Sequence, residues 1–281
     1  MIATAVSGTH LVWHLLDKLS LDLRVQVEVL APFGMTGVAR IPSLWMSLLP
    51  GRDIVSDSVR NTGEFHCPGL FRQLVATAAS AQPAESTLRV VEVGGFLGDC
   101  LLWAGAYLGP DRLQALEVEP VAAATSRLRQ SLAEAGFASA VSVTTEAVGD
   151  GEEYGAFAVG ASGHVPANPN FEVKRGVSAE AAAAQHGRLR RRLRSLDEIL
   201  EEWLEPGAVL DLVRVKAAGS EPAILRGLQR HLAAAQVRQL MVTSNSNGVA
   251  EIRDLMARQA TRYQMCPTTT KGDTLLYCLT T

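Results

Sequence analysis

The sequence predicts an α/β protein built on a Rossmann-like, mostly parallel β-sheet, and three observations support this. With 281 residues, 47% of them hydrophobic, the chain can bury one full-sized core. From Leu88 onward, short apolar runs alternate with helical patterns, as in βαβ units. The first apolar run leads directly into Gly94, Gly95 and Gly98. Such a turn at the end of a buried strand is typical of a ligand-binding crevice.

Residues 1–85 are expected to form a separate segment that covers the cleft of a domain spanning 86–281. Leu11, Leu15 and Leu19 recur at a spacing of four, which predicts an amphipathic helix near the start. The following part holds several prolines and is expected to be irregular. The polar, small-residue tract "ASAQPAEST" then indicates the boundary loop.

The first half of the larger domain is predicted to alternate strand and helix. Strands are expected at 88–94, 113–119 and 140–148, with helices at 97–109 and 120–136 between them. The first helix should stop at Gly109-Pro110, and the second has Pro120 near its start.

The second half continues the pattern after an irregular stretch at 149–176 that contains a short strand, "YGAFAVG". An Ala-rich helix at 178–186 follows, and Ser195 with Glu198 forms a capping box that starts another helix. The remaining elements are predicted as strands at 208–217, 237–244 and 273–281, with helices at 220–236 and 249–260. We expect the C-terminal strand to be antiparallel.

Composition and charge exclude several classes of protein. The chain has 26 basic and 29 acidic residues, so no net field draws it to nucleic acid or to a membrane surface. The sequence contains no run of about 18 apolar residues without charges, so no membrane span is predicted. His10 and His14 share a helical face but have no third ligand, so no metal is expected. The four cysteines form no Cys-x-x-Cys pair, and we expect reduced, partly buried thiols in a cytoplasmic protein: Cys67, Cys100, Cys266 and Cys278.

The glycine turn carries the functional prediction. It departs from the Gly-x-Gly-x-x-Gly fingerprint of dinucleotide sites, and Glu92 stands two residues before its first glycine. A carboxylate there would repel a pyrophosphate but would suit a cationic amino-acid group, which favours S-adenosylmethionine over NAD. A turn without a ligand and a nucleotide site remain alternatives. Glu117, at the end of the next strand, could accept ribose hydroxyls, with Glu119 as the competing acid on the same strand face.

Several ordered blocks then resemble one family. They are "VVEVGGFLGD", "LQALEVEP", "TTEAVGDGE", "RSLDEIL" and "DLVRVKAAGSEPAILRG". In this order they look like the FkbM-type S-adenosylmethionine (SAM)-dependent methyltransferases, over about residues 52–245. The resemblance implies a class I methyltransferase fold that binds SAM and methylates hydroxyl oxygens of sugars or small molecules. The cofactor-binding positions that it implies are Glu92, Gly94, Gly95, Phe96, Gly98, Glu117, Val118, Glu146 and Ala147.

The departures from the family pattern lie on the acceptor side. Lys216, Ala218 and Thr243 stand where the family has acids, and His66 falls where an acid is common. An oxygen acceptor must lose its proton, so Lys216, His66 and Glu221 are weak candidates for a catalytic role. A SAM-binding relative without activity is the main alternative, and a nicotinamide-dependent oxidoreductase is a distant one.

A run of five arginines between 188 and 194 has no interleaved aromatic residues. It is expected to be a solvated helix face or strand edge rather than a nucleic-acid surface. Contact with an anionic substrate is a further alternative.

Overall fold

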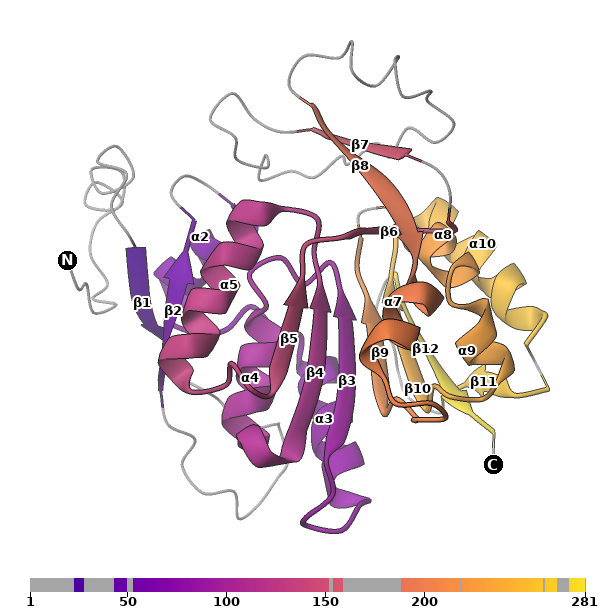
Figure 1. The fold of residues 1–281 in the computed structure, drawn as a ribbon, viewed down its shortest axis with the longest axis horizontal. Helices are drawn as coiled ribbons and strands as arrows, with labels where there is room; N and C mark the ends of the chain where they lie inside the picture. The colour runs from indigo at the N-terminus through magenta and orange to yellow at the C-terminus, as the bar shows by residue number, and fades with distance from the viewer. Residues whose placement is uncertain are drawn as a thin grey trace.

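The computed structural model describes residues 23–27, 43–49, 53–151, 154–158, 188–217, 219–259, 261–266 and 273–280. Its centre is a seven-stranded sheet in the order β11-β12-β10-β9-β3-β4-β5 (Figure 1). The bounds of these strands are β3 Leu88–Val93, β4 Leu113–Val118, β5 Val141–Thr144, β9 Leu212–Val215, β10 Gln239–Thr243, β11 Tyr263–Met265 and β12 Thr274–Leu279.

The pairing within this sheet confirms the predicted fold class. Strand β3 is central and lies parallel to β4 on one side and to β9 on the other. Strand β12 inserts antiparallel between β10 and β11. Numbered along the chain, the seven strands therefore run 3-2-1-4-5-7-6, a Rossmann-like class I methyltransferase sheet with one antiparallel C-terminal strand.

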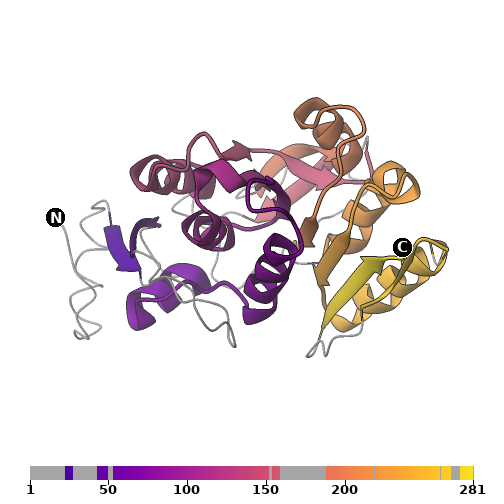
Figure 2. The same ribbon diagram turned by 90° about the horizontal axis from the view of Figure 1, so that it is seen from below.

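Helices cover both faces of the sheet, as expected for a doubly wound fold (Figures 1 and 2). One apolar core joins alternate strand residues such as Val90 and Ala115 to α3 Gly69–Ser80, α4 Asp99–Leu108 and α5 Ala122–Ala135. The other core joins Val91 and Leu116 to the remaining helices. Those helices are α7 Leu196–Trp203, α8 Glu221–Arg226, α9 Gln229–Ala233 and α10 Ser246–Ala257.

The described part of the N-terminal segment is more regular than expected. Strands β1 Leu23–Val27 and β2 Leu44–Leu48 form an antiparallel pair, and α2 Ile54–Thr62 precedes α3. Strand β2 packs on α5, where the Ser47 N–H donates to Ser131 Oγ at 2.9 Å. The N-terminal strands and the C-terminal strands lie at opposite ends of the molecule (Figure 2).

A second, three-stranded sheet lies beyond the carboxyl ends of β3, β4 and β5 (Figure 1). It consists of β6 Ala147–Gly149, β8 Arg188–Ser195 and β7 Tyr154–Ala158, and a short 3-10 helix, η1 Pro110–Arg112, completes the elements. The strand expected at 140–148 is therefore divided between two sheets. The arginine run is a strand, and the capping box of Ser195 and Glu198 is confirmed.

The helix predicted at 220–236 is two short helices, α8 and α9. The break lies at Gly227, where an added Cβ would come within 2.1 Å of the Gly149 carbonyl oxygen of β6. Strand β11 was not predicted. Leu11, Leu15, Leu19, the histidines at 10 and 14 and the helix expected at 178–186 lie outside the described residues.

The prediction of four reduced thiols is wrong. Cys67 pairs with Cys100, and Cys266 pairs with Cys278. The scattered spacing of the cysteines therefore did not indicate whether they are reduced. Disulfides form and persist mainly in oxidising compartments, so the expectation of a reducing compartment loses its support. Among the described residues, no helix is long and apolar enough to span a membrane, and no group of three or more His, Cys, Asp or Glu side chains is arranged to hold a metal ion.

Candidate functional site at the carboxyl ends of β3, β4 and β9

The glycine turn connects β3 to α4 and is packed tightly on its surroundings. Gly94 and Gly98 have positive φ values of 80° and 65°, which favour glycine. A Cβ on Gly94 would come within 2.2 Å of the Lys216 carbonyl oxygen, and one on Gly95 within 2.3 Å of Glu117 Oε2. Phe96 also has a positive φ, of 59°. The turn therefore depends on its glycines both for backbone conformation and for close approach.

Glu117, the predicted ribose acid, lies directly beneath this turn. The Gly95 N–H donates to Glu117 Oε1 at 2.8 Å, whereas Oε2 is buried and has no hydrogen-bond partner among the described residues. Burial, and then the neighbouring Glu119 carboxylate, raise the pKa of Glu117 well above its ordinary value. Buried polar atoms in proteins are usually hydrogen-bonded, so Oε2 is available to a ligand that brings a hydroxyl group or positive charge.

Glu119 also contacts the turn, although only one of the two acids was expected to do so. Its carboxylate accepts the N–H groups of Phe96 at 3.2 Å and of Val121 at 2.9 Å. Burial raises its pKa to about 7 despite these two hydrogen bonds. Glu119 therefore fixes the turn by accepting the Phe96 N–H, whereas Glu117 uses only Oε1 in a hydrogen bond among the described residues.

Asp99 is a site residue that the sequence interpretation missed. It is the first residue of α4, is buried, and has its carboxylate stabilised by the backbone N–H groups of Asp99 and Cys100. Burial nevertheless raises its pKa to about 6, and the positive charge of Lys216 opposes this shift. Its position directly after the last glycine of the turn was the signal that could have identified it.

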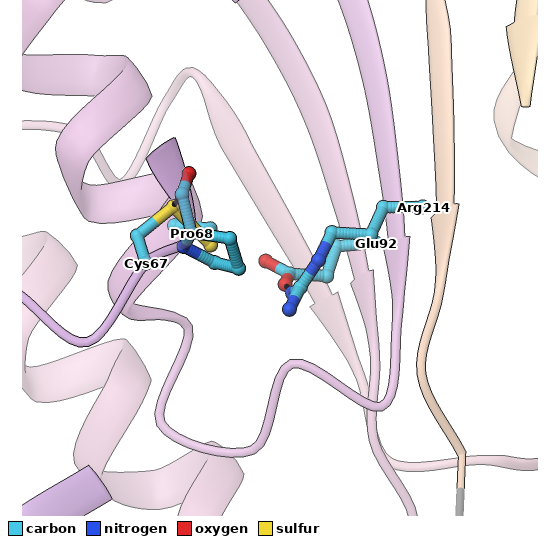
Figure 3. The surroundings of a disulfide bond; sticks show 5 residues. Cys67, Pro68, Glu92 and Arg214 are labelled. Atoms are coloured by element: carbon cyan, nitrogen blue, oxygen red, sulfur yellow. Dashed lines mark hydrogen bonds and ion pairs between the residues drawn. A yellow bond between two sulfur atoms is a disulfide. The ribbon is translucent and has the colours of Figure 1, made fainter. Parts of the chain in front are cut away.

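Glu92 does not present a free carboxylate, which changes the role expected for it. Arg214, its register partner on β9, forms a buried ion pair with Glu92 Oε1 (Figure 3). The Arg214 guanidinium also lies over the Phe71 ring of α3, 5.8 Å from its centroid. Burial lowers the pKa of Arg214 to about 10, so it remains charged at neutral pH. The cation at Glu92 is thus supplied by the protein itself.

The weak catalytic candidates Lys216 and His66 share one neighbourhood. Lys216 follows β9, and its N–H donates to the Val93 carbonyl at 2.9 Å. Its side chain reaches solvent, but partial desolvation and then the Arg214 charge lower its pKa. Partial burial and then the charges of Lys216 and Arg214 lower the pKa of half-buried His66. At neutral pH, His66 is therefore the uncharged member of this group.

Glu221, the third candidate, hydrogen-bonds to the backbone of the loop after β9. Its buried carboxylate accepts the N–H groups of Ala217 and Gly219, at 2.8 and 3.0 Å, and the Ser244 hydroxyl at 2.9 Å. These bonds join the loop after β9 to the end of β10. Among the described residues, these contacts are those of a loop anchor.

The remaining predicted positions lie around the edge of this region. Val118 is buried at the end of β4, and Ala147 is buried in β6. Glu146 is partly exposed, with one carboxylate oxygen 3.9 Å from Arg194 Nη1 of β8. Thr243 ends β10, where its hydroxyl bonds to that of Thr274 at 3.1 Å. The Ala218 position lies outside the described residues.

Four buried carboxylates thus surround one glycine turn: Glu92, Asp99, Glu117 and Glu119. Within the described ranges, Glu92 is the one among them that is ion-paired with an arginine. A pyrophosphate brought here would further oppose ionisation of Asp99, Glu117 and Glu119, whose pKa values burial already raises, whereas a cation would favour it. The site therefore suits a ligand that brings hydroxyl groups and positive charge.

No protein-family model and no curated protein matches this sequence. Solved structures with a similar fold include the methyltransferase FkbM from Methylobacillus flagellatus KT, at a TM-score of 0.44 and 14% identity. That match covers 68% of this chain and 43% of the FkbM chain. The O-methyltransferase TomG from Streptomyces achromogenes has a TM-score of 0.42 and 20% identity, covering 74% and 79% of the two chains. The METTL16 methyltransferase domain has a TM-score of 0.46 and 11% identity, and the match covers 83% of this chain and 69% of that chain.

Proposed function

We propose that this chain transfers a methyl group from S-adenosyl-L-methionine to a hydroxyl oxygen of a small molecule or sugar. The observation that supports this most strongly is the buried Glu117 Oε2, which lies against the backbone of Gly95 and has no hydrogen-bond partner in the described part of the chain. In this fold, ligands bind outside the carboxyl ends of the strands, where both residues lie.

The residues at the turn fit the cofactor in part. Glu117 would accept ribose hydroxyls, and the acidic surroundings would favour the positively charged sulfonium over the anionic pyrophosphate of NAD. Glu92 fits less well as a direct ligand, because Arg214 already neutralises it. When bound, the cofactor supplies an electrophilic methyl group.

His66 is the residue best suited to take the proton from the acceptor. Its Nδ1 lies 3.2 Å from Ser58 Oγ. With Nδ1 donating to this hydroxyl, Nε2 keeps a lone pair, and the lowered pKa keeps the ring neutral and able to accept a proton. Lys216 would hold an acceptor oxygen by charge.

Isothermal titration calorimetry with SAM, S-adenosylhomocysteine and NAD tests the cofactor assignment. We expect saturable binding of the first two and none of NAD. Glu117→Gln should weaken SAM binding by about 5- to 100-fold, since the amide group that replaces Oε2 cannot accept a hydroxyl proton and an unmade buried hydrogen bond costs about 1–3 kcal/mol. Glu85→Gln, an exposed acid in the turn before β3, is the matched control and should bind SAM normally. NAD binding, or equal SAM affinity in both variants, would refute the assignment.

A SAM-binding protein without methyl transfer is the second candidate. The pairing of Glu92 with Arg214 and the basic residues Lys216 and His66 on the acceptor side favour it. Saturable SAM binding with no S-adenosylhomocysteine formed across a broad panel of hydroxylated acceptors would support this alternative.

A further inference from the structure

The Cys67–Cys100 disulfide connects the N-terminal segment to the cofactor turn. Its Cα atoms are 4.9 Å apart. Cys67 directly follows His66, and Cys100 is the second residue of α4, directly after Asp99. The disulfide therefore ties the residue next to His66, the candidate base, to the residue next to the buried Asp99.

The chain next to this disulfide also lies on the Glu92–Arg214 ion pair. Pro68 lies between the disulfide and the ion pair in Figure 3, and Phe71, three residues further on, contacts the Arg214 guanidinium. The hydrogen bond of His66 is made to Ser58 of α2, within the same N-terminal segment. The position of His66 relative to Lys216 and Arg214 therefore depends on how this segment is attached to the core.

We propose that the Cys67–Cys100 disulfide is a positioning bond for the acceptor half of the site, which holds His66 near Lys216 and releases it on reduction. This rests on the proposed function. A dithiol reductant would supply two electrons and two protons, so that the S–S bond breaks, two S–H bonds form, and the reductant becomes a disulfide. Glu117 and the glycine turn belong to the core and would keep their geometry.

The second disulfide provides an internal control. Cys266–Cys278 joins the residue after β11 to β12, where the Cys266 N–H already donates to the Leu276 carbonyl at 3.0 Å. These strands lie at the edge of the sheet, with β10 and β9 between them and β3. When this disulfide is broken, the hydrogen bonds between β11 and β12 still hold the local geometry, and the site is unaffected.

The experiment compares the double variants Cys67→Ala/Cys100→Ala and Cys266→Ala/Cys278→Ala with the wild type. Histidine ring signals are followed by NMR against pH, with His66 assigned from a His66→Gln variant, and SAM binding is measured by calorimetry. We expect the pKa of His66 to return toward its ordinary 6.5 in the first variant and to stay lowered in the second. The SAM dissociation constant should change less than about threefold in either variant.

A parallel measurement avoids dependence on the folding of the first variant. In Cys266→Ala/Cys278→Ala, Cys67–Cys100 is the remaining disulfide, and because both its cysteines are buried, treatment with dithiothreitol is continued until two free thiols are counted. The His66 shift should appear on this reduction and reverse on reoxidation. An unchanged His66 signal after reduction would overturn the proposal, as would SAM binding lost in parallel with the shift. If the wild type fails to bind SAM, the proposed function fails, while the NMR comparison still tests the positioning.

Discussion

Glu119→Gln should reduce the dependence of folding stability on pH. The Glu119 carboxyl has a folded pKa of about 7 and an ordinary value of 4.5. Because burial raises this pKa, its stabilising contribution is complete below the unfolded pKa and is lost as pH rises through 7. Between about pH 5 and about pH 8, linkage gives a loss of roughly 2.5 kcal/mol in the free energy of unfolding.

Glutamine cannot titrate, so the variant lacks this loss. It also gives up one of two hydrogen bonds, since its amide offers one acceptor oxygen to the N–H groups of Phe96 and Val121. That cost is nearly the same at both pH values and cancels in the difference. Urea denaturation of both proteins at the two pH values measures the effect. The reasoning is wrong if the free energy of unfolding falls equally in the wild type and in the variant from the lower pH to the higher pH.

Two further substitutions test the packing of the site. Arg214→Met leaves Glu92 buried without a cation and should lower the free energy of unfolding by about 3–5 kcal/mol. The double variant Glu92→Leu/Arg214→Met should recover most of this loss, and a double variant as unstable as Arg214→Met would argue against the ion pair. Gly98→Ala places a Cβ within 2.5 Å of Leu128 at a φ of 65° and should cost about 2–4 kcal/mol by chemical denaturation. Gly136→Ala, at a φ of 77° with open space around it, should cost only about 1 kcal/mol, and an equal loss at both positions would exclude the clash.

The parts of the fold and site that the sequence predicted are those with local signals. The alternation of strand and helix, the capping box at Ser195 and the glycine turn each depend on residues within a few positions of one another. Glu117 was expected near the glycine turn because strand ends meet at one edge of a parallel sheet, and it does accept the Gly95 N–H, while its role toward a ligand stays a prediction.

The parts that were missed depend on contacts between distant segments. Arg214 meets Glu92 only because β9 lies beside β3, and no short-range pattern encodes that pairing. Cysteine spacing does not determine connectivity, so the two disulfides could not be deduced. The break between α8 and α9 follows from the contact of Gly227 with β6, a strand that belongs to another sheet.

The ion pair between β3 and β9 has a consequence for the order of folding. Strands β3, β4 and β5 follow one another with a single α-helix between neighbours, so their contacts are comparatively local. Strand β9 comes much later in the chain, after the whole second sheet and α7. Until it docks, the half-sheet must leave Glu92 in water or bury an uncompensated charge. We therefore expect the early intermediate to stay open at this edge, and arrival of Arg214 to be the step that lets the nascent core close.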